Sequence, residues 1–185
     1  MTLHERVKLT LEDFERIIDL PENADKLFEF IGGEIVEVPS NPYVSSVGYN
    51  IGAPLKVFVK QHKLGHVTGE AGGYIIAGER YAPDVAFISY ARQPELAREG
   101  YNPNPPELAI EVEFPTSTQS ERNLRIKLSN YLSVGTVVWV IYPETKEVEV
   151  YLPGHPVKIL GMNDVLRGDP VLPGFEIAVS DIFAE

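Results

Sequence analysis

The sequence has no cysteine, and its basic residues are outnumbered by its acidic ones. The absence of cysteine excludes a disulfide scaffold, a thiolate zinc site, an iron–sulfur cluster and a cysteine nucleophile. Lys and Arg total 16 against 27 Asp and Glu, so the formal net charge is −11. Proteins that hold nucleic acid by charge alone are basic. Any contact of this chain with nucleic acid must therefore be local, with a metal ion between carboxylates and phosphate.

Long hydrophobic runs are also missing. The longest apolar run is 137–142, far below the roughly 20 residues that a membrane span requires. Residues 1–8 contain neither an apolar core nor a small-residue cleavage site, so we expect no signal peptide, no membrane partner and a cytoplasmic location. The 185 residues, 44% hydrophobic and 23% charged, suit one globular domain that spans 1–185.

The first 43 residues carry two local signals. Thr10 and Asp13 form a capping box in its Asp variant, which predicts a short helix that ends by Leu20. Gly32 and Gly33 stand between two apolar segments and predict a tight β-hairpin. The expected hairpin strands are 28–31 and 34–38. We therefore expect a helix and a hairpin over 1–43, ahead of the main body of the domain.

The rest of the chain predicts an α/β (α+β) fold with a mixed sheet flanked by helices. A long helix is expected at 44–63, with Pro54 causing a kink or a late start and Gly65 as its C-cap. A second helix is expected at 120–134, and 90–106 has the composition of a surface loop. Strands are expected at 66–70, 73–77, 82–89, 107–114, 137–142, 148–152 and 157–160. This divides the domain into a catalytic core at 44–142 and C-terminal strands with a tail at 143–185.

Carboxylates occur on two of these strands where apolar or small residues are expected. In the strand 107–114, alternation puts Glu111 and Glu113 on the row opposite the apolar residues. In the strand 82–89, Asp84 falls on the row that holds Ala86. If the two strands are neighbours, we expect Asp84 and Glu111 to converge on a face lined by alanines. Small neighbours would leave space beside the carboxylates.

Two desolvated carboxylates that lie close together repel each other. One of them must be protonated, or a cation must neutralise both. Acids from two strands suit Mg²⁺, which takes one or two carboxylates and keeps several waters. A carboxylate pair also occurs in glycosidases, but that reaction needs an open sugar groove that nothing in this sequence indicates.

Lys127 lies at the border of the apolar stripe of the helix 120–134. Two interpretations are open for a lysine at such a position. Its ammonium can extend to water at the surface. It can instead reach over the sheet towards the acids of the preceding strand.

The order of these motifs resembles the PD-(D/E)XK nucleases, in the form in which the lysine has moved to the following helix. More closely, it resembles the putative restriction endonuclease family common in cyanobacteria. The matching segments are Phe28-Glu29-Phe30-Ile31-Gly32-Gly33-Glu34, Ala82-Pro83-Asp84-Val85-Ala86-Phe87, Leu108-Ala109-Ile110-Glu111-Val112, Lys127 with Tyr131 and Gly135, Val138-Trp139-Val140, and Leu172-Pro173-Gly174-Phe175. They cover most of the chain, and their order and spacing are more specific than any one of them.

The resemblance implies a core of helix, three strands, helix and strand. It also implies that Asp84 and Glu111, with the backbone carbonyl of Val112, ligate Mg²⁺ or Mn²⁺. Lys127 would then orient or activate the water that attacks a phosphodiester, with the metal as Lewis acid.

The chain departs from the family pattern at several places, and two of these departures concern candidate site residues. Glu113 stands where the basic PD-(D/E)XK pattern has its lysine, so it is a candidate third acid or base. The helix 44–63 carries no Asp or Glu, although many such nucleases have an acid on that helix. Glu29 is the first candidate to replace it, and Glu70 is the second.

The sequence therefore predicts a metal-dependent endonuclease that acts on DNA. Cutting both strands of a duplex needs two sites, which makes a homodimer compatible with this activity. The alternative that stays open is a catalytically inactive module of the same fold that binds nucleic acid or protein.

Overall fold

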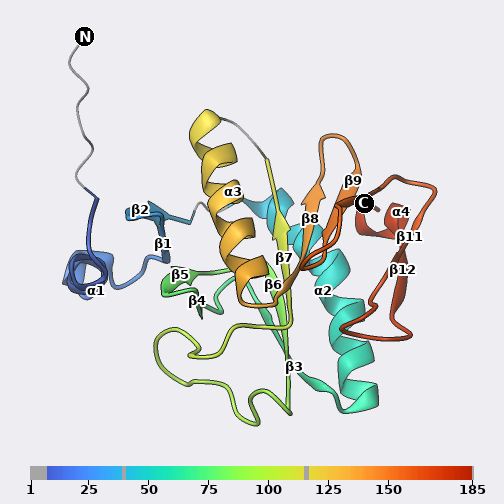
Figure 1. The fold of residues 1–185 in the computed structure, drawn as a ribbon, viewed down its shortest axis with the longest axis horizontal. Coiled ribbons are helices and arrows are strands. Elements are labelled where there is room, and N and C mark those ends of the chain that lie inside the picture. Colours follow the sequence, from blue (N-terminus) through green and yellow to red (C-terminus); the bar gives the residue numbers. More distant parts are fainter. Residues whose placement is uncertain (1–7, 39–40, 115–116, 185) are drawn as a thin grey trace.

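The structure is a computed structural model that describes residues 8–38, 41–114 and 117–184 (Figure 1). In chain order its elements are α1 (Leu11–Ile18), η1 (Pro21–Asn23), β1 (Phe28–Ile31), β2 (Glu34–Glu37), α2 (Pro42–His62), β3 (Gly65–Gly69), β4 (Tyr74–Ile76), β5 (Glu79–Tyr81), β6 (Val85–Ser89), β7 (Leu108–Val112), α3 (Thr118–Ser133), β8 (Val137–Tyr142), β9 (Glu147–Tyr151), β10 (Lys158–Leu160), β11 (Val165–Arg167), β12 (Glu176–Ala178) and α4 (Val179–Ile182).

A six-stranded mixed sheet forms the centre, in the order β10-β9-β8-β7-β6-β3. Strands β7 and β8 are parallel and are joined by helix α3, while the other four pairings are antiparallel. Strand β8 is buried almost throughout, as expected of a central strand that is covered on both faces. The predicted mixed sheet flanked by helices is confirmed.

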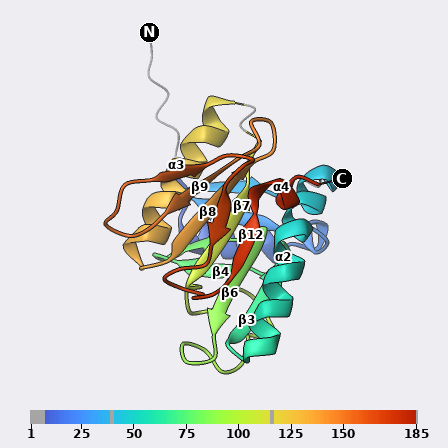
Figure 2. The same cartoon turned by 90° about the vertical axis from the view of Figure 1, so that its right-hand side faces the viewer.

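The two faces of this sheet are covered by different helices (Figures 1 and 2). Helix α2 packs on one face, where its buried residues Val47, Ile51 and Leu55 join the apolar residues of β6, β7 and β8. Helix α3 packs on the other face through Leu124 and Leu128. Each helix is amphipathic, and its apolar stripe covers one face of the sheet. The alternation of side chains along β7 therefore decides which helix each residue meets.

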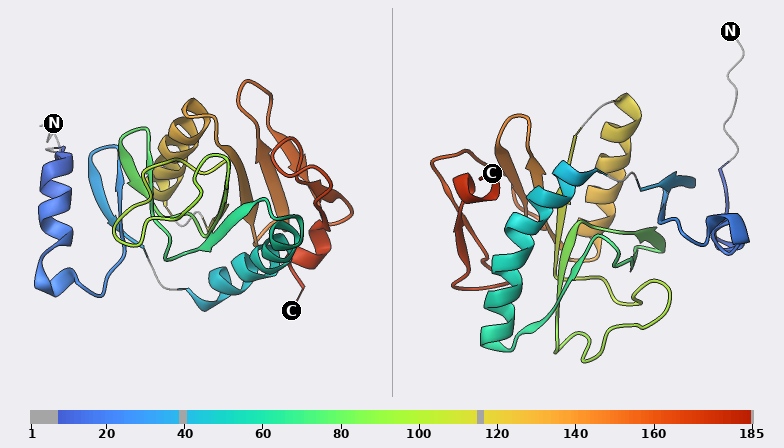
Figure 3. Two further views of the ribbon diagram at one scale, coloured as in Figure 1. Left: turned by 90° about the horizontal axis from the view of Figure 1, so that it is seen from below. Right: turned by 180° about the vertical axis from the view of Figure 1, so that it is seen from behind.

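A second, smaller sheet carries the N-terminal hairpin, in the order β2-β1-β5-β4. It lies on the α3 side, and its residues Tyr74, Ile76 and Tyr81 pack into the same cluster as α3. The N-terminal elements and the C-terminal elements β11, β12 and α4 lie at opposite ends of the molecule (Figure 3). The hairpin prediction is confirmed, since Gly32 and Gly33 take φ values of 59° and 85° at the turn.

Helix α2 differs from the prediction at both ends. It begins at Pro42 rather than at Val44, because the side chain of Asn41 caps the amides of the first turn. It continues through Pro54, so the expected late start is wrong. The helix ends at His62, and its C-cap is Lys63, whose backbone is left-handed with φ 53°, whereas Gly65 already belongs to β3.

Other elements were missed or misjudged. Strand β5, the β11–β12 pair and helix α4 had no periodic signal because each is only three or four residues long. The segment 90–106 is irregular, as predicted, but it is not wholly at the surface. Gln93 and Asn102 are buried and bonded to each other through their side-chain amides, at 2.6 and 2.9 Å. Paired amides satisfy each other's donors and acceptors, which permits their burial.

The contact between α2 and the sheet gives the first testable prediction. Leu55 is 0% exposed in the core cluster, so Leu55→Ala should lower the free energy of unfolding by about 2–5 kcal/mol. Val57, which is 54% exposed on the same helix, is the matched control, and Val57→Ala should change stability by less than about 0.5 kcal/mol. Urea unfolding measures both, and equal losses would show that α2 does not pack as described.

Candidate active site

Three charged side chains from three elements meet in the interior on the α3 side of the sheet. The ammonium of Lys127 donates to Glu111 Oε2 at 2.8 Å and to Glu29 Oε1 at 3.0 Å. The side chains of Lys127, Glu111 and Glu29 are 7%, 5% and 9% exposed, respectively. We call Glu29, Lys127 and Glu111 the buried triad. Of the two interpretations of Lys127, the structure shows the one in which it reaches the acid on the preceding strand.

Neighbouring groups fix both carboxylates of the buried triad. The Tyr131 hydroxyl donates to Glu111 Oε1 at 2.8 Å, so each oxygen of that carboxylate has a donor. The backbone amide of Ala82 donates to Glu29 Oε1 at 2.8 Å. Lys127 and Tyr131 are one helical turn apart on α3, which directs both side chains to the same carboxylate. The triad therefore connects the hairpin, the central sheet and α3.

The electrostatic balance of the buried triad favours a charged lysine. Burial by itself lowers the pKa of Lys127, but the carboxylates of Glu111, Glu29 and Glu113 outweigh it and hold that pKa well above the usual value. Burial raises the pKa of Glu111, and the ammonium of Lys127 opposes that rise. One cation thus faces several acids, and the region has an excess of negative charge.

Asp84 lies beside the end of strand β7 and next to helix α2. Its Oδ2 accepts from the backbone amide of Val112 at 2.7 Å. Its Cβ is 3.8 Å from the position that a Cβ would take on Gly48 of α2. Asp84 sits in a bend just before β6, which begins at Val85, and its charge is close enough to raise the pKa of Glu111. The convergence of Asp84 and Glu111 on one ion stays a prediction. Alternation along a strand does not extend to a residue outside it.

The expected space beside the alanines is absent. Ala86 and Ala109 are 0% exposed and belong to the cluster that α3 covers. Their small side chains let Leu128 and Tyr131 approach the sheet closely, so they serve packing rather than a ligand. The open space near the carboxylates lies instead on the α2 side.

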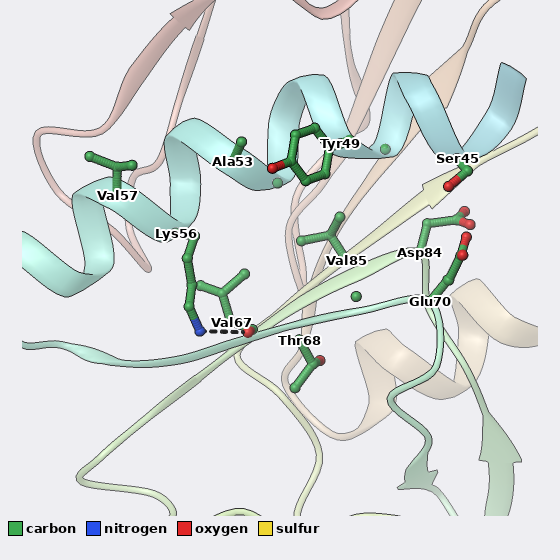
Figure 4. A pocket seen from close by; sticks show the side chains of 13 residues that line it. Ser45, Tyr49, Ala53, Lys56, Val57, Val67, Thr68, Glu70, Asp84 and Val85 are labelled. Carbon is green, nitrogen blue, oxygen red and sulfur yellow. Dashed lines mark hydrogen bonds between the residues drawn. The ribbon is translucent and has the colours of Figure 1, made fainter. Parts of the chain in front are cut away.

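A pocket of about 450 Å³ opens on that side and has Asp84 and Glu70 at one end (Figure 4). The two carboxylates lie near each other in Figure 4. Burial raises the pKa of Asp84 to about 6, and the charges of Glu29 and Glu70 add to the rise, while the Val112 amide and Lys127 oppose it. Burial also raises the pKa of Glu113. These carboxylates ionise at a cost in free energy unless a cation is near.

The donor set suits a hard divalent cation, although the geometry is not that of a closed metal site. Among the described residues, no three acidic or histidine side chains are positioned to hold one metal ion. Within that part of the chain, neither Asp84 Oδ1 nor the Glu113 carboxylate has a hydrogen-bond donor. Oxygen atoms that are partly buried and lack donors are the ligands that Mg²⁺ and Mn²⁺ take. The roles of Asp84, Glu111 and the Val112 carbonyl as ligands stay predictions.

Comparison with known proteins adds the family. A model of the Uma2 family, described as "Putative restriction endonuclease", matches residues 11–180. The chain belongs to the Uma2 family. The match spans every element that contributes to the buried triad and to the pocket, so the family resemblance seen in the sequence is confirmed.

A solved structure has the same fold as this Uma2 chain. It is a putative nuclease of DUF820 from Anabaena variabilis ATCC 29413, with a TM-score of 0.77 and 21% sequence identity over 95% of this chain and 97% of that one. No curated protein matches the sequence. Within residues 8–38, 41–114 and 117–184, no helix has the length and apolarity that crossing a membrane requires.

Sequence reasoning missed two contributors to the site. Tyr131 was part of the family motif, but its bond to Glu111 was not foreseen, although its spacing of four from Lys127 places both on one helix face. Tyr49 on α2 lines the pocket beside Asp84, and only its unusual position among small residues of that helix could have indicated it.

The buried triad gives the second prediction. Lys127→Met leaves Glu29 and Glu111 buried without their cation, so the free energy of unfolding at neutral pH should fall by roughly 3–5 kcal/mol. The double variant Lys127→Met with Glu29→Gln should recover part of this loss because one of the repelling charges is gone. Urea unfolding of both proteins measures the effect, and a double variant no more stable than the single one would contradict it.

Asp84 gives the third prediction, for the metal-free protein in EDTA. The pKa of Asp84 is raised from 3.8 to about 6 in the folded state. The folded state therefore binds the proton more tightly than the unfolded state. Ionisation of Asp84 thus lowers the stability of the fold as the pH rises from about 4 through about 6. Asp84→Asn should therefore unfold with a free energy about 1–3 kcal/mol higher than wild type at pH 8, and the difference should vanish below about pH 4. Denaturation at both pH values tests this, and parallel pH profiles would refute it.

Proposed function

We propose that this Uma2 protein is a divalent-metal-dependent endonuclease that hydrolyses DNA phosphodiester bonds. The observation that supports this best is the buried triad next to the Asp84–Val112 contact. One strand, β7, carries Glu111 on the side of Lys127 and, in the following residue, the amide that holds Asp84. Both family acids and the family lysine are thus gathered at the same end of the sheet.

Asp84, Glu111 and the carbonyl of Val112 would hold Mg²⁺ or Mn²⁺. When bound, such an ion acts as a Lewis acid on the phosphate and lowers the pKa of the attacking water. Glu111 lies on β7 and Asp84 directly before the neighbouring strand β6, so the sheet limits their separation. Their raised pKa values favour an incoming cation, because the cation replaces protons or relieves repulsion.

Lys127 supplies the positive charge that the acids lack. An ammonium has three N–H donors, and two of them bind Glu111 and Glu29. The third is available to a water or to a phosphate oxygen, where a fixed cation stabilises the negative charge that grows during hydrolysis. Glu29 has a positioning role here, since it holds the ammonium from the side opposite Glu111.

Glu113 is the second candidate for the water-handling role. It follows Glu111 by two residues, about 7 Å along the chain at ~3.3 Å per residue. A carboxylate there can accept a proton from water or ligate the ion. It also adds negative charge beside an anionic substrate, which is why we assign the larger role to Lys127.

The fourth prediction compares these two residues. Lys127→Ala should lower single-turnover cleavage of plasmid DNA in Mn²⁺ by on the order of 10²-fold or more, because the charge on the phosphate loses its partner. Glu113→Gln should lose less. Since Lys127 also stabilises the fold, near-UV circular dichroism must show that the variant is folded at the assay temperature.

Metal binding is the matched readout that does not depend on cleavage. Mn²⁺ bound only by the folded protein should raise the melting temperature of wild type and of Glu113→Gln, but not that of Asp84→Asn. An inactive Glu113→Gln beside an active Lys127→Ala would reverse the two roles. If wild type cuts no DNA with any divalent metal, the chain is a catalytically inactive module that binds nucleic acid or protein.

A further inference from the structure

The pocket beside Asp84 extends well beyond the two carboxylates. It follows α2 from Ser45 to Lys56, about 16 Å at 1.5 Å per residue, with the start of β6 and strand β3 as its opposite wall (Figure 4). Its volume of about 450 Å³ lies within the range of small-ligand sites. We call this pocket the α2 groove. Its full lining is Ser45, Gly48, Tyr49, Gly52, Ala53, Lys56, Val57, Val67, Thr68, Gly69, Glu70, Asp84 and Val85.

The wall residues make the middle of the α2 groove apolar and flat. On the helix side, Gly52 and Ala53 have too little side chain to fill the groove, while Val67 and Val85 line the sheet side. Tyr49 stands over this stretch with 74% of its surface exposed, and its ring lies along the helix in Figure 4. A largely exposed aromatic ring beside an apolar wall offers a face on which a planar ring can stack.

The two ends of the α2 groove differ in charge. Asp84 and Glu70 close one end, whereas Lys56 stands at the other with its ammonium bound to the carbonyl of Val67 at 3.0 Å. The acidic end is continuous with the proposed catalytic centre, since Asp84 belongs to both. A ligand that fills the groove up to this end therefore reaches the proposed catalytic centre.

We propose that the α2 groove binds an unpaired nucleotide next to the reacting phosphodiester, with its base stacked on Tyr49. This rests on the proposed function, and it specifies the substrate as a single strand, a strand end or a flipped nucleotide. A base inside an intact duplex is stacked on both sides and has no free face to offer, so it must leave the stack to enter such a pocket.

The charge of the protein agrees with a substrate bound by stacking. The net charge is −11, and the lysine in the α2 groove is bound to a backbone carbonyl. Duplex binders gain most of their affinity by displacing counterions from many phosphates, which an acidic protein does poorly. Stacking on an aromatic ring contributes without net charge. Binding should accordingly depend weakly on salt, with a slope of log K against log[salt] shallower than about −2.

The test is binding of fluorescent oligonucleotides of about 10 nucleotides, single-stranded or as a blunt duplex, with Ca²⁺ as the divalent ion and intact DNA confirmed on a gel. Wild type should bind the single strand more tightly than the duplex. Tyr49→Ala should weaken single-strand binding by about 5- to 100-fold, whereas Tyr49→Phe should keep it. Ala53→Leu, which keeps Tyr49 but fills the groove next to it, should weaken binding as well.

Tyr90→Ala is the matched control. Tyr90 is also exposed, at 45%, but packs against His66 at the far end of β6, so its loss should leave binding unchanged. If Tyr49→Ala and Tyr90→Ala have equal effects, if the duplex binds at least as tightly as the single strand, or if wild type binds neither, the inference is overturned.

Binding without cleavage separates this inference from the proposed function. A wild type that shows Tyr49-dependent binding of single strands but cuts no DNA would support the groove and refute the endonuclease. A wild type that cuts plasmid DNA but binds single strands independently of Tyr49 would support the endonuclease and refute the groove.

Discussion

The ion pairs of Lys127 with Glu111 and Glu29 are the interaction on which the rest of the structure depends. They bring together β7, α3 and the N-terminal hairpin, three elements that are far apart in the sequence. Burying three charges is costly, and replacing such a group by apolar residues often stabilises a fold. A stable core alone would therefore not require this arrangement. Its persistence within the apolar cluster of α3 is best explained by the chemistry that we propose for it.

The same arrangement separates two tasks. On the α3 side, the buried triad is largely shielded from solvent, so its charges interact strongly. On the α2 side, Asp84 faces a pocket that is open to a substrate. Strand β7 lies between the two sides and contacts both. A shielded cation and an accessible acid at the same end of the sheet form an asymmetric site.

The sequence predicted the core elements well because their signals are local. The capping box at Thr10, the Gly32-Gly33 turn and the alternation in β7 each depend on neighbours within a few residues. Lys127 was predicted at the border of the apolar stripe of its helix, and it is buried with that stripe. Glu29 was predicted only as one of two replacements for a missing acid. Its bond to Lys127 was not predicted, because the two residues are 98 positions apart in the chain. Alternation could not orient Asp84, because this residue lies in a bend outside β6. The α2 groove depends on which helix residues face the sheet across a gap, which periodicity does not reveal.

Strand β7 has a consequence for how this fold can vary between relatives. Glu111 binds Lys127 through its side chain and the next residue, Val112, binds Asp84 through its backbone amide, so both contacts of the site depend on two adjacent residues of one strand. Inserting or deleting a single residue in β7 would turn every later side chain to the opposite face. The contacts with Lys127 and with Asp84 would then be lost together. The irregular segment between β6 and β7 has no such restriction at its tip. Evolution and protein engineering can therefore change the length of that loop, while β7 must keep its length.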